Sequence, residues 1–408
     1  MSMRHCMLIS SLLAAIALSA CGENDSASTA SVAPTTESLT TEAPTNAAPA
    51  TEAPAATLDP AVEAMMYTAA GPYPVGVTTL ELAAGNEVEV WYPAVEGTMG
   101  TDSYDMRDFI PEAVVAILTS NVPVVYEYEA GRDAKVANGA FPVVLFSHGA
   151  FGFRFQSTFL TSHLASWGMI VAAPEHRSRN LISLLSRVAE DRNLADGDLL
   201  GALDLLFNGS SSPTSPLSQH IDTSRVAAVG HSAGGGTILS AAFDDRIDGY
   251  ISLASGALGM TSEPSTARTL PDKPSFFIAG ALDAIISAEE STRPSFEAVP
   301  GPSRLWIIDE MGHNGFTDFC TFGNGTGIIG VAIASGLESF LEGFGPLRAL
   351  GEDGCIPPAG PVEFGFPIIK HAVTAQLRFW FGDDATPVGL DSSVSDQYEL
   401  AVSIDSKD

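Results

Sequence analysis

The chain has 408 residues, which is enough for one large domain or two small ones. Its 49 acidic and 19 basic residues give it a formal net charge of −30 at pH 7. This balance favours solubility and excludes nucleic acid as a partner, because so few cations cannot form a basic surface for phosphates.

The first twenty-two residues have the features of an export signal. An apolar run covers residues 7–18, and the letters LSACG follow at residues 18–22. The run is too short to span a bilayer and has the length of a signal-peptide core. The segment resembles a bacterial lipoprotein signal, which predicts a signal peptide at residues 1–20 and a lipidated Cys21. The alternative is an ordinary cleaved secretory signal with an incidental cysteine.

Residues 21–64 contain mostly Ala, Thr, Pro, Ser and Glu, with few large apolar side chains. Such a composition cannot bury a core and predicts a disordered tether. No Lys or Arg occurs between Arg4 and Arg107, so this acidic segment should not lie on an anionic bilayer. We expect a lipid-anchored protein of the bacterial cell envelope, exported to the periplasm or the outer surface and held on a membrane without crossing it.

The pattern from residue 65 to residue 386 predicts one catalytic domain, followed by a C-terminal tail at 387–408. Alternating apolar residues predict a hairpin of two strands, with Gly85-Asn86 at its turn. Short continuous apolar runs predict strands buried on both faces, at residues 142–146, 169–173, 226–229, 250–253, 275–279 and 304–308. Helical patterns lie between and after them, at residues 158–167, 181–207 with a break near Asn193, and 367–381. This alternation predicts an α/β fold with a mostly parallel central sheet and helices on both faces.

Residues 230–234 read GHSAG and follow the apolar run at 226–229. Glycines on both sides of Ser232 permit a sharp strand-to-helix turn, where Cβ atoms would collide with the neighbouring strand and helix. Such a turn holds the serine in a strained conformation and exposes its Oγ above the sheet. The sequence therefore predicts Ser232 as the nucleophile of an α/β-hydrolase fold.

In this fold the acid and then the base follow the serine along the chain. Only His313 and His371 follow a plausible acid, and His313 comes just after the apolar run at 304–308. We predict His313 as the base, because a loop after a late strand can reach over the nucleophile. His371 lies within the last predicted helix and is expected to pack or face the surface, and His231 is expected to orient its neighbours.

The predicted acid is Asp283, which follows the apolar run at 275–279. It therefore lies at the carboxyl end of a strand, where α/β sheets bind ligands. An ordinary turn aspartate is the alternative. Asp309 and Glu310 are rivals by residue type, but they lie too close to His313 in sequence to be its partner.

Hydrolysis through a serine also needs N–H groups that bind the oxyanion. One is expected from Ala233, directly after the nucleophile. The other is expected from Ala150, in the loop SHGAFG at residues 147–152, whose glycines let the main chain approach a substrate closely.

Cys320 and Cys355 remain after the signal peptide and the lipidated cysteine are set aside. In an exported protein two such cysteines usually pair, and this bridge would stabilise the fold by roughly 3 kcal/mol. Two buried free thiols are the alternative. No H-E-x-x-H, paired C-x-x-C or glycine-rich dinucleotide motif occurs, so no metal and no cofactor is expected.

Six segments of the sequence resemble the platelet-activating factor acetylhydrolases. They are residues 71–76, 146–154, 164–168, 172–177, 221–235 and 312–319. The chain is also similar to dienelactone-hydrolase-like esterases and, more distantly, to cutinase-like polyester hydrolases. The first resemblance implies a calcium-independent serine esterase for short or oxidised acyl chains of phospholipids, with Ser232 and His313 at matching positions.

The acid departs from the acetylhydrolase pattern. In the animal acetylhydrolases it follows the strand after the elbow helix, and here that place reads LASG at residues 253–256. Asp283 lies one strand later, which is the position used by most α/β-hydrolases, the cutinase-like ones included. The letters EHR at residues 175–177 are expected to form a structural cluster of ion pairs and hydrogen bonds.

These features predict a lipid-anchored carboxylic ester hydrolase whose partner is an ester substrate, with phospholipid among the candidates. A polyester hydrolase of the cutinase-like kind and an acyltransferase would use the same three catalytic side chains. A non-catalytic binding lipoprotein is a further alternative, which the complete set of catalytic residues disfavours.

Overall fold

The computed structural model of the chain describes residues 60–118, 122–186, 194–256, 269–343 and 347–408. The predicted signal peptide, Cys21, nearly all of the tether and the helix break expected near Asn193 lie outside these ranges. Within them, no helix is both long enough and apolar enough to cross a membrane.

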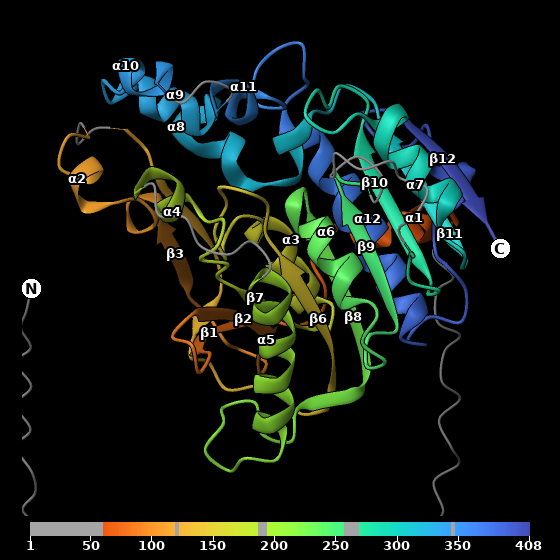
Figure 1. Cartoon of the computed structure of the whole chain (residues 1–408). Coiled ribbons are helices and arrows are strands. Elements are labelled where there is room, and N and C mark those ends of the chain that lie inside the picture. Colours follow the sequence, from red (N-terminus) through yellow and green to blue (C-terminus); the bar gives the residue numbers. More distant parts are fainter. Residues whose placement is uncertain (1–59, 119–121, 187–193, 257–268, 344–346) are drawn as a thin grey trace, which may run out of the picture. The chain divides into compact units, whose positions relative to one another are not determined.

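A ten-stranded sheet forms the centre of the fold (Figure 1). In spatial order its strands are β12 (Val402–Lys407), β11 (Ser303–Ile308), β10 (Ser275–Gly280), β9 (Gly249–Leu253), β8 (Ile221–His231), β6 (Phe141–Ser147), β7 (Ile170–Pro174), β2 (Glu87–Pro93), β1 (Val75–Glu81) and β5 (Gly131–Arg132). The strands from β11 to β7 run parallel to one another, whereas β12 and β2 pair antiparallel with their neighbours β11 and β7. The predicted mostly parallel sheet is confirmed.

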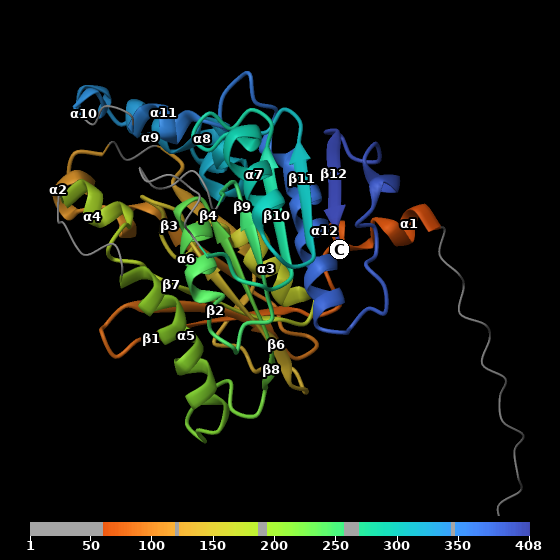
Figure 2. The same ribbon diagram turned by 45° about the vertical axis from the view of Figure 1, so that its right-hand side comes forward.

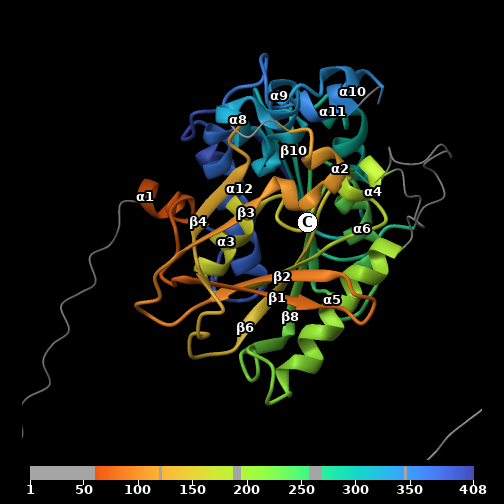
Figure 3. The same ribbon diagram turned by 90° about the vertical axis from the view of Figure 1, so that its left-hand side faces the viewer.

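Helices cover both faces of this sheet (Figures 2 and 3). One face carries α3 (Thr158–Ser166) and α12 (Val362–Trp380), and the other carries α5 (Leu194–Ser210), α6 (Ala233–Ala241) and α7 (Arg293–Ala298). Side chains alternate along each strand, so Val144 and Phe146 of β6 join the core under α3, whereas Val143 and Leu145 join the core under α5. This two-sided burial explains why the central strands are continuous apolar runs.

The remaining elements lie above or beside the sheet. They are α1 (Pro60–Ala64), the strand pair β3 (Thr101–Asp105) and β4 (Val125–Glu129), α2 (Glu112–Val115), α4 (Leu181–Ser186), α8 (Phe322–Gly325), α9 (Gly327–Ala334), α10 (Glu338–Glu342) and α11 (Leu347–Glu352). The segment from α8 to α11, residues 322–352, is called the cap below. A disulfide between Cys320 and Cys355 joins the chain just before the cap to the chain just after it, which confirms the predicted pairing.

The predicted C-terminal tail at 387–408 is wrong. Residues 402–407 form β12, which pairs with β11 along its whole length, and Leu390, Val394 and Leu400 are buried. The segment is short and mostly polar, so its pattern alone does not reveal that β11 needs an edge partner. The predicted start of the last helix also needs correction, because α12 begins at Val362 and carries Pro367 inside it. The strands β3 and β4 were not predicted from the sequence.

Buried neutral histidines make the fold sensitive to acid, and His163 on α3 is a clear case. Its Nε2 lies 2.9 Å from the carbonyl oxygen of Tyr67, and burial lowers its pKa from 6.5 to about 3. The unfolded chain therefore binds a proton that the folded chain does not, so stability is complete above pH 6.5 and falls as the pH drops toward 3.

We expect His163→Gln, whose amide can keep the hydrogen bond to Tyr67, to remove this dependence. The free energy of unfolding of the parent should fall by about 1.4 kcal/mol per pH unit relative to the variant between pH 6 and pH 4. Urea unfolding of both proteins at each pH measures the difference. Parallel stability curves across this range would contradict the expectation.

Candidate active site

Ser232 stands at the sharp turn between β8 and α6, with φ 55° and ψ −121°. A Cβ atom at Gly230 would lie 2.4 Å from the carbonyl oxygen of Gly234. A Cβ atom at Gly234 would lie 2.0 Å from the carbonyl oxygen of Ser147, at the end of β6. Only glycine fits at both positions, so the collisions expected from the sequence are the reason for the GHSAG pattern.

The structure brings the three predicted catalytic side chains together. His313, directly after β11, places its Nε2 2.9 Å from Ser232 Oγ and its Nδ1 2.8 Å from Asp283 Oδ2. The other oxygen of Asp283 accepts the backbone N–H groups of Ile285 and Ile286, at 2.9 and 2.7 Å. Because both carboxylate oxygens accept, we assign the imidazole hydrogen to Nδ1, and Nε2 is free to accept the serine hydroxyl hydrogen.

The rival residues lie elsewhere. Asp309 and Glu310 are exposed on the turn after β11. His371 is buried in α12, where its Nε2 lies 3.2 Å from the carbonyl oxygen of Gly389. Its role is packing and hydrogen bonding within the fold.

His231 connects the base to the loop that carries Ala150. Its Nε2 lies 3.0 Å from the carbonyl oxygen of His313, and its Nδ1 lies 3.0 Å from the amide nitrogen of Gln156. The amide oxygen of Gln156 accepts the N–H of Gly149 at 2.9 Å. Burial lowers the pKa of His231 well below its usual value, so the ring stays neutral and keeps one donor and one acceptor.

The two residues predicted as oxyanion donors, Ala233 and Ala150, both lie close to Ser232. Ala233 is the first residue of α6, and a helix provides no internal acceptor for its first N–H groups. In the loop 149–152, the N–H of Phe151 donates to Arg179 and that of Gly152 donates to Gly149. Ala150 lines the same cavity as Ser232.

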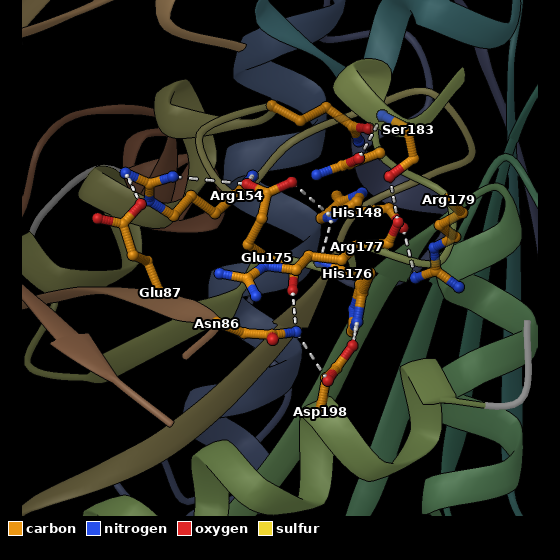
Figure 4. Close-up of polar contacts among 12 residues, drawn as sticks. Asn86, Glu87, His148, Arg154, Glu175, His176, Arg177, Arg179, Ser183 and Asp198 are labelled. Carbon is orange, nitrogen blue, oxygen red and sulfur yellow. Dashed lines mark hydrogen bonds and ion pairs between the residues drawn. The ribbon is translucent and has the colours of Figure 1, made fainter. Parts of the chain in front are cut away.

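A polar network lies behind this loop (Figure 4). One nitrogen of the Arg179 guanidinium, Nη2, donates to the carbonyl oxygen of His148 and to Ser147 Oγ, both at 2.7 Å. The other, Nη1, donates to Thr237 Oγ1 at 2.6 Å and to the carbonyl oxygen of Ala233 at 3.3 Å. A single cation therefore joins the two segments that carry the predicted oxyanion donors.

Two neutral histidines complete the network (Figure 4). His148 Nε2 accepts the N–H of His176 at 3.0 Å, so its Nδ1 carries the hydrogen that the carbonyl oxygen of Gly149 accepts at 2.8 Å. His176 lies between Asp198 and Ser147, at 3.1 and 2.9 Å. Burial lowers the pKa of His148 to about 3 and that of His176 well below its usual value, so neither ring adds a charge to the site.

Of the EHR letters at 175–177, His176 belongs to this network, whereas Glu175 and Arg177 lie at its edge. Glu175 is buried and accepts the N–H of Arg154 at 3.0 Å. The Arg177 guanidinium is exposed and donates to the carbonyl oxygen of Gly85.

We expect Arg179→Met to lower kcat about 10- to 100-fold and to leave KM nearly unchanged. The variant keeps Ser232 and His313 but no longer holds the two donor segments together. The expected loss in kcat is smaller than the loss that usually follows complete removal of an oxyanion donor. Steady-state kinetics on p-nitrophenyl acetate would measure it, with Arg225→Met as the matched control, because Arg225 forms ion pairs with Asp222 and Asp383 only at the periphery. A variant that loses affinity rather than turnover would contradict the expected positioning role.

Asp353 is a supporting residue that the sequence did not reveal. One of its oxygens accepts the N–H of His313 at 2.6 Å, and the other accepts the N–H of Ala284 at 3.0 Å. The carboxylate therefore fixes the loop of the base relative to the loop of the acid. Its only signal in the sequence is its place two residues before Cys355, in a segment that the disulfide holds against the fold.

Residues 134–343 match the protein-family model described as PETase: PET hydrolase-like. The match covers just over half of the chain. The chain belongs to the PET hydrolase-like family. Membership makes this PET hydrolase-like protein a carboxylic ester hydrolase with an α/β-hydrolase fold, as the sequence predicted.

Ser232, Asp283 and His313 all lie within the part that matches the PET hydrolase-like family. The sequence pointed first to the acetylhydrolases and only more distantly to polyester hydrolases. The position of Asp283 after β10 agrees with the resemblance to polyester hydrolases, because residues 254–256, directly after β9, include no carboxylate.

Proposed function

We propose that this PET hydrolase-like protein is a serine esterase that works through an acyl-enzyme. The observation that carries the proposal is the chain of hydrogen bonds from Ser232 through His313 to Asp283. Ser232 Oγ attacks the acyl carbon while His313 Nε2 takes the hydroxyl proton. The N–H groups of Ala150 and Ala233 bind the oxyanion of the tetrahedral intermediate.

The intermediate then breaks its bond to the alkoxy oxygen, and His313 returns the proton to the leaving alcohol. A water molecule next gives its proton to His313 and attacks the acyl carbon. The carboxylic acid leaves, and Ser232 regains its hydrogen. Throughout the cycle Asp283 holds the Nδ1–H of His313 and stabilises the imidazolium that forms.

We further propose short-chain or lipid-like acyl esters as substrates, in the manner of platelet-activating factor acetylhydrolase. Support comes from the motifs on both sides of Ser232 and His313. Polyester hydrolysis is a second candidate, which the family match favours.

The proposal includes a lipid anchor at Cys21 and a location in the bacterial cell envelope. The sequence motif at residues 18–22 supports the anchor. The disulfide between Cys320 and Cys355 supports an oxidising compartment, because cytosolic reductants keep most thiols reduced.

Reaction with a fluorophosphonate probe tests the proposed chemistry. We expect the probe to label Ser232, identified by peptide mass spectrometry, and to abolish hydrolysis of p-nitrophenyl butyrate. The unlabelled protein should release acetate from a 2-acetyl phospholipid, whereas soluble products from a polyester film would favour the second candidate. A folded protein that neither reacts nor hydrolyses would instead favour the binding-lipoprotein alternative.

A further inference from the structure

A cavity opens onto Ser232 Oγ beneath the cap. The space between its lining residues is about 910 Å³, with the open solvent at its mouth included. Among the lining residues that the structure describes, the polar ones all lie around the nucleophile: Gln156, His231, Ser232, His313 and Asn314. Every other described residue in its lining is apolar, and none carries a charge.

Two walls enclose this cavity. The cap supplies one wall, with Ile329 and Val331 from α9 and Leu350 from α11. Residues around α2 and α4 supply the other, with Val114 and Leu181. Figure 3 shows the cap above the sheet, with α2 and α4 beside it.

Most of the lining side chains are aliphatic. Away from the histidines next to the nucleophile, the aromatic members of the lining are Phe151 and Phe319. Stacked rings are the usual contact for an aromatic ligand, whereas branched aliphatic walls suit a flexible alkyl chain. A charged head group would lose its hydration in such a site without finding a partner.

Access to the nucleophile is narrow. Ser232 is 8% exposed, Asp283 6% and His313 1%. A ligand therefore reaches Ser232 through the cavity beneath the cap, which a single flexible chain can enter end-on more readily than the face of a solid polymer. The family match does not decide whether the cavity admits polymeric substrates. It spans residues 134–343 and therefore omits Val114, Leu347 and Leu350 of the walls.

We infer that the cavity binds one uncharged aliphatic chain of a monomeric ester and that the cap selects against polymeric substrates. The inference rests on the proposed serine esterase function of the same site. The chain can belong to the acyl group or to the alcohol, since both flank the carbonyl that Ser232 attacks.

A chain-length series on the full chain tests the inference. With p-nitrophenyl esters from acetate to palmitate, kcat/KM should rise about two- to fourfold per added methylene group and then fall when the cavity is full. A parallel series from ethyl acetate to decyl acetate separates an alcohol chain from an acyl chain. An amorphous film of an aromatic polyester should release no measurable product.

Two substitutions of one wall residue sharpen the test. Leu350→Trp should move the preferred chain to a shorter length, and Leu350→Ala should move it to a longer one. Ile356→Trp is the matched control, because Ile356 is 41% exposed and lies outside the cavity lining, just beyond α11. If the larger side chain impairs folding, Leu350→Ala still gives the shift in the opposite direction.

The outcomes separate this inference from the function on which it rests. Three results would overturn the inference about the cavity and leave the proposed esterase function intact. They are equal kcat/KM along both series, an unchanged preferred chain length in both Leu350 variants, or turnover of the polyester film as fast as that of p-nitrophenyl octanoate. Failure of the fluorophosphonate probe to label Ser232, with no hydrolysis of any ester, would overturn the function itself.

Discussion

Ser232→Ala is expected to lower kcat for p-nitrophenyl butyrate on the order of a millionfold. The substitution removes the only atom that attacks the acyl carbon, whereas the hydrogen bond between His313 and Asp283 is retained. Ser232 Oγ lies in hydrogen-bond distance of His313 Nε2, a contact that the fold does not need, so the thermal midpoint should stay nearly the same.

The kinetic assay and a thermal scan measure the two parts of this expectation. Ser275→Ala is a suitable control, because Ser275 is also buried and hydrogen-bonded, to Ser303 of β11, but lies at the end of β10 away from Asp283. It should keep nearly all activity. Activity of Ser232→Ala close to that of the parent would mean that another residue attacks the ester.

Asp283→Asn should lower kcat about 10³- to 10⁴-fold. The two N–H groups of Ile285 and Ile286 would bind the amide oxygen, which places the amide NH₂ against Nδ1 of His313. Nδ1 must then accept, so the ring hydrogen moves to Nε2 and faces Ser232 Oγ. In this tautomer the histidine cannot take the hydroxyl proton.

Steady-state kinetics with Asp309→Asn as the control would check this prediction, because Asp309 is the exposed rival next to the base. The control should keep its activity within a factor of a few. If Asp283→Asn stays within tenfold of the parent, the acid must be assigned to another residue.

Local sequence patterns were sufficient to predict the central strands and the turn that carries the nucleophile. The apolar run at 142–146 predicted β6 to within one residue at each end, and the GHSAG letters located the turn at Ser232. The chain order of the superfamily then led to Asp283 and His313, which the structure brings into one hydrogen-bonded row.

Features that depend on contacts between distant segments could not be predicted in this way. β12 is a short polar strand whose only reason to form is the free edge of β11. Arg179 acts through carbonyl and hydroxyl oxygens of residues that are 31 to 58 positions away in sequence. Neither residue type nor spacing identifies such partners, because their geometry exists only once the sheet has formed.

The position of Asp353 has a consequence for evolution and engineering. This carboxylate follows α11 directly, yet it holds the backbone of both His313 and Ala284. The cap and the catalytic loops of His313 and Asp283 are therefore structurally coupled. Grafting a different lid from a relative would change turnover as well as selectivity, unless the graft brings its own anchor for those two amides.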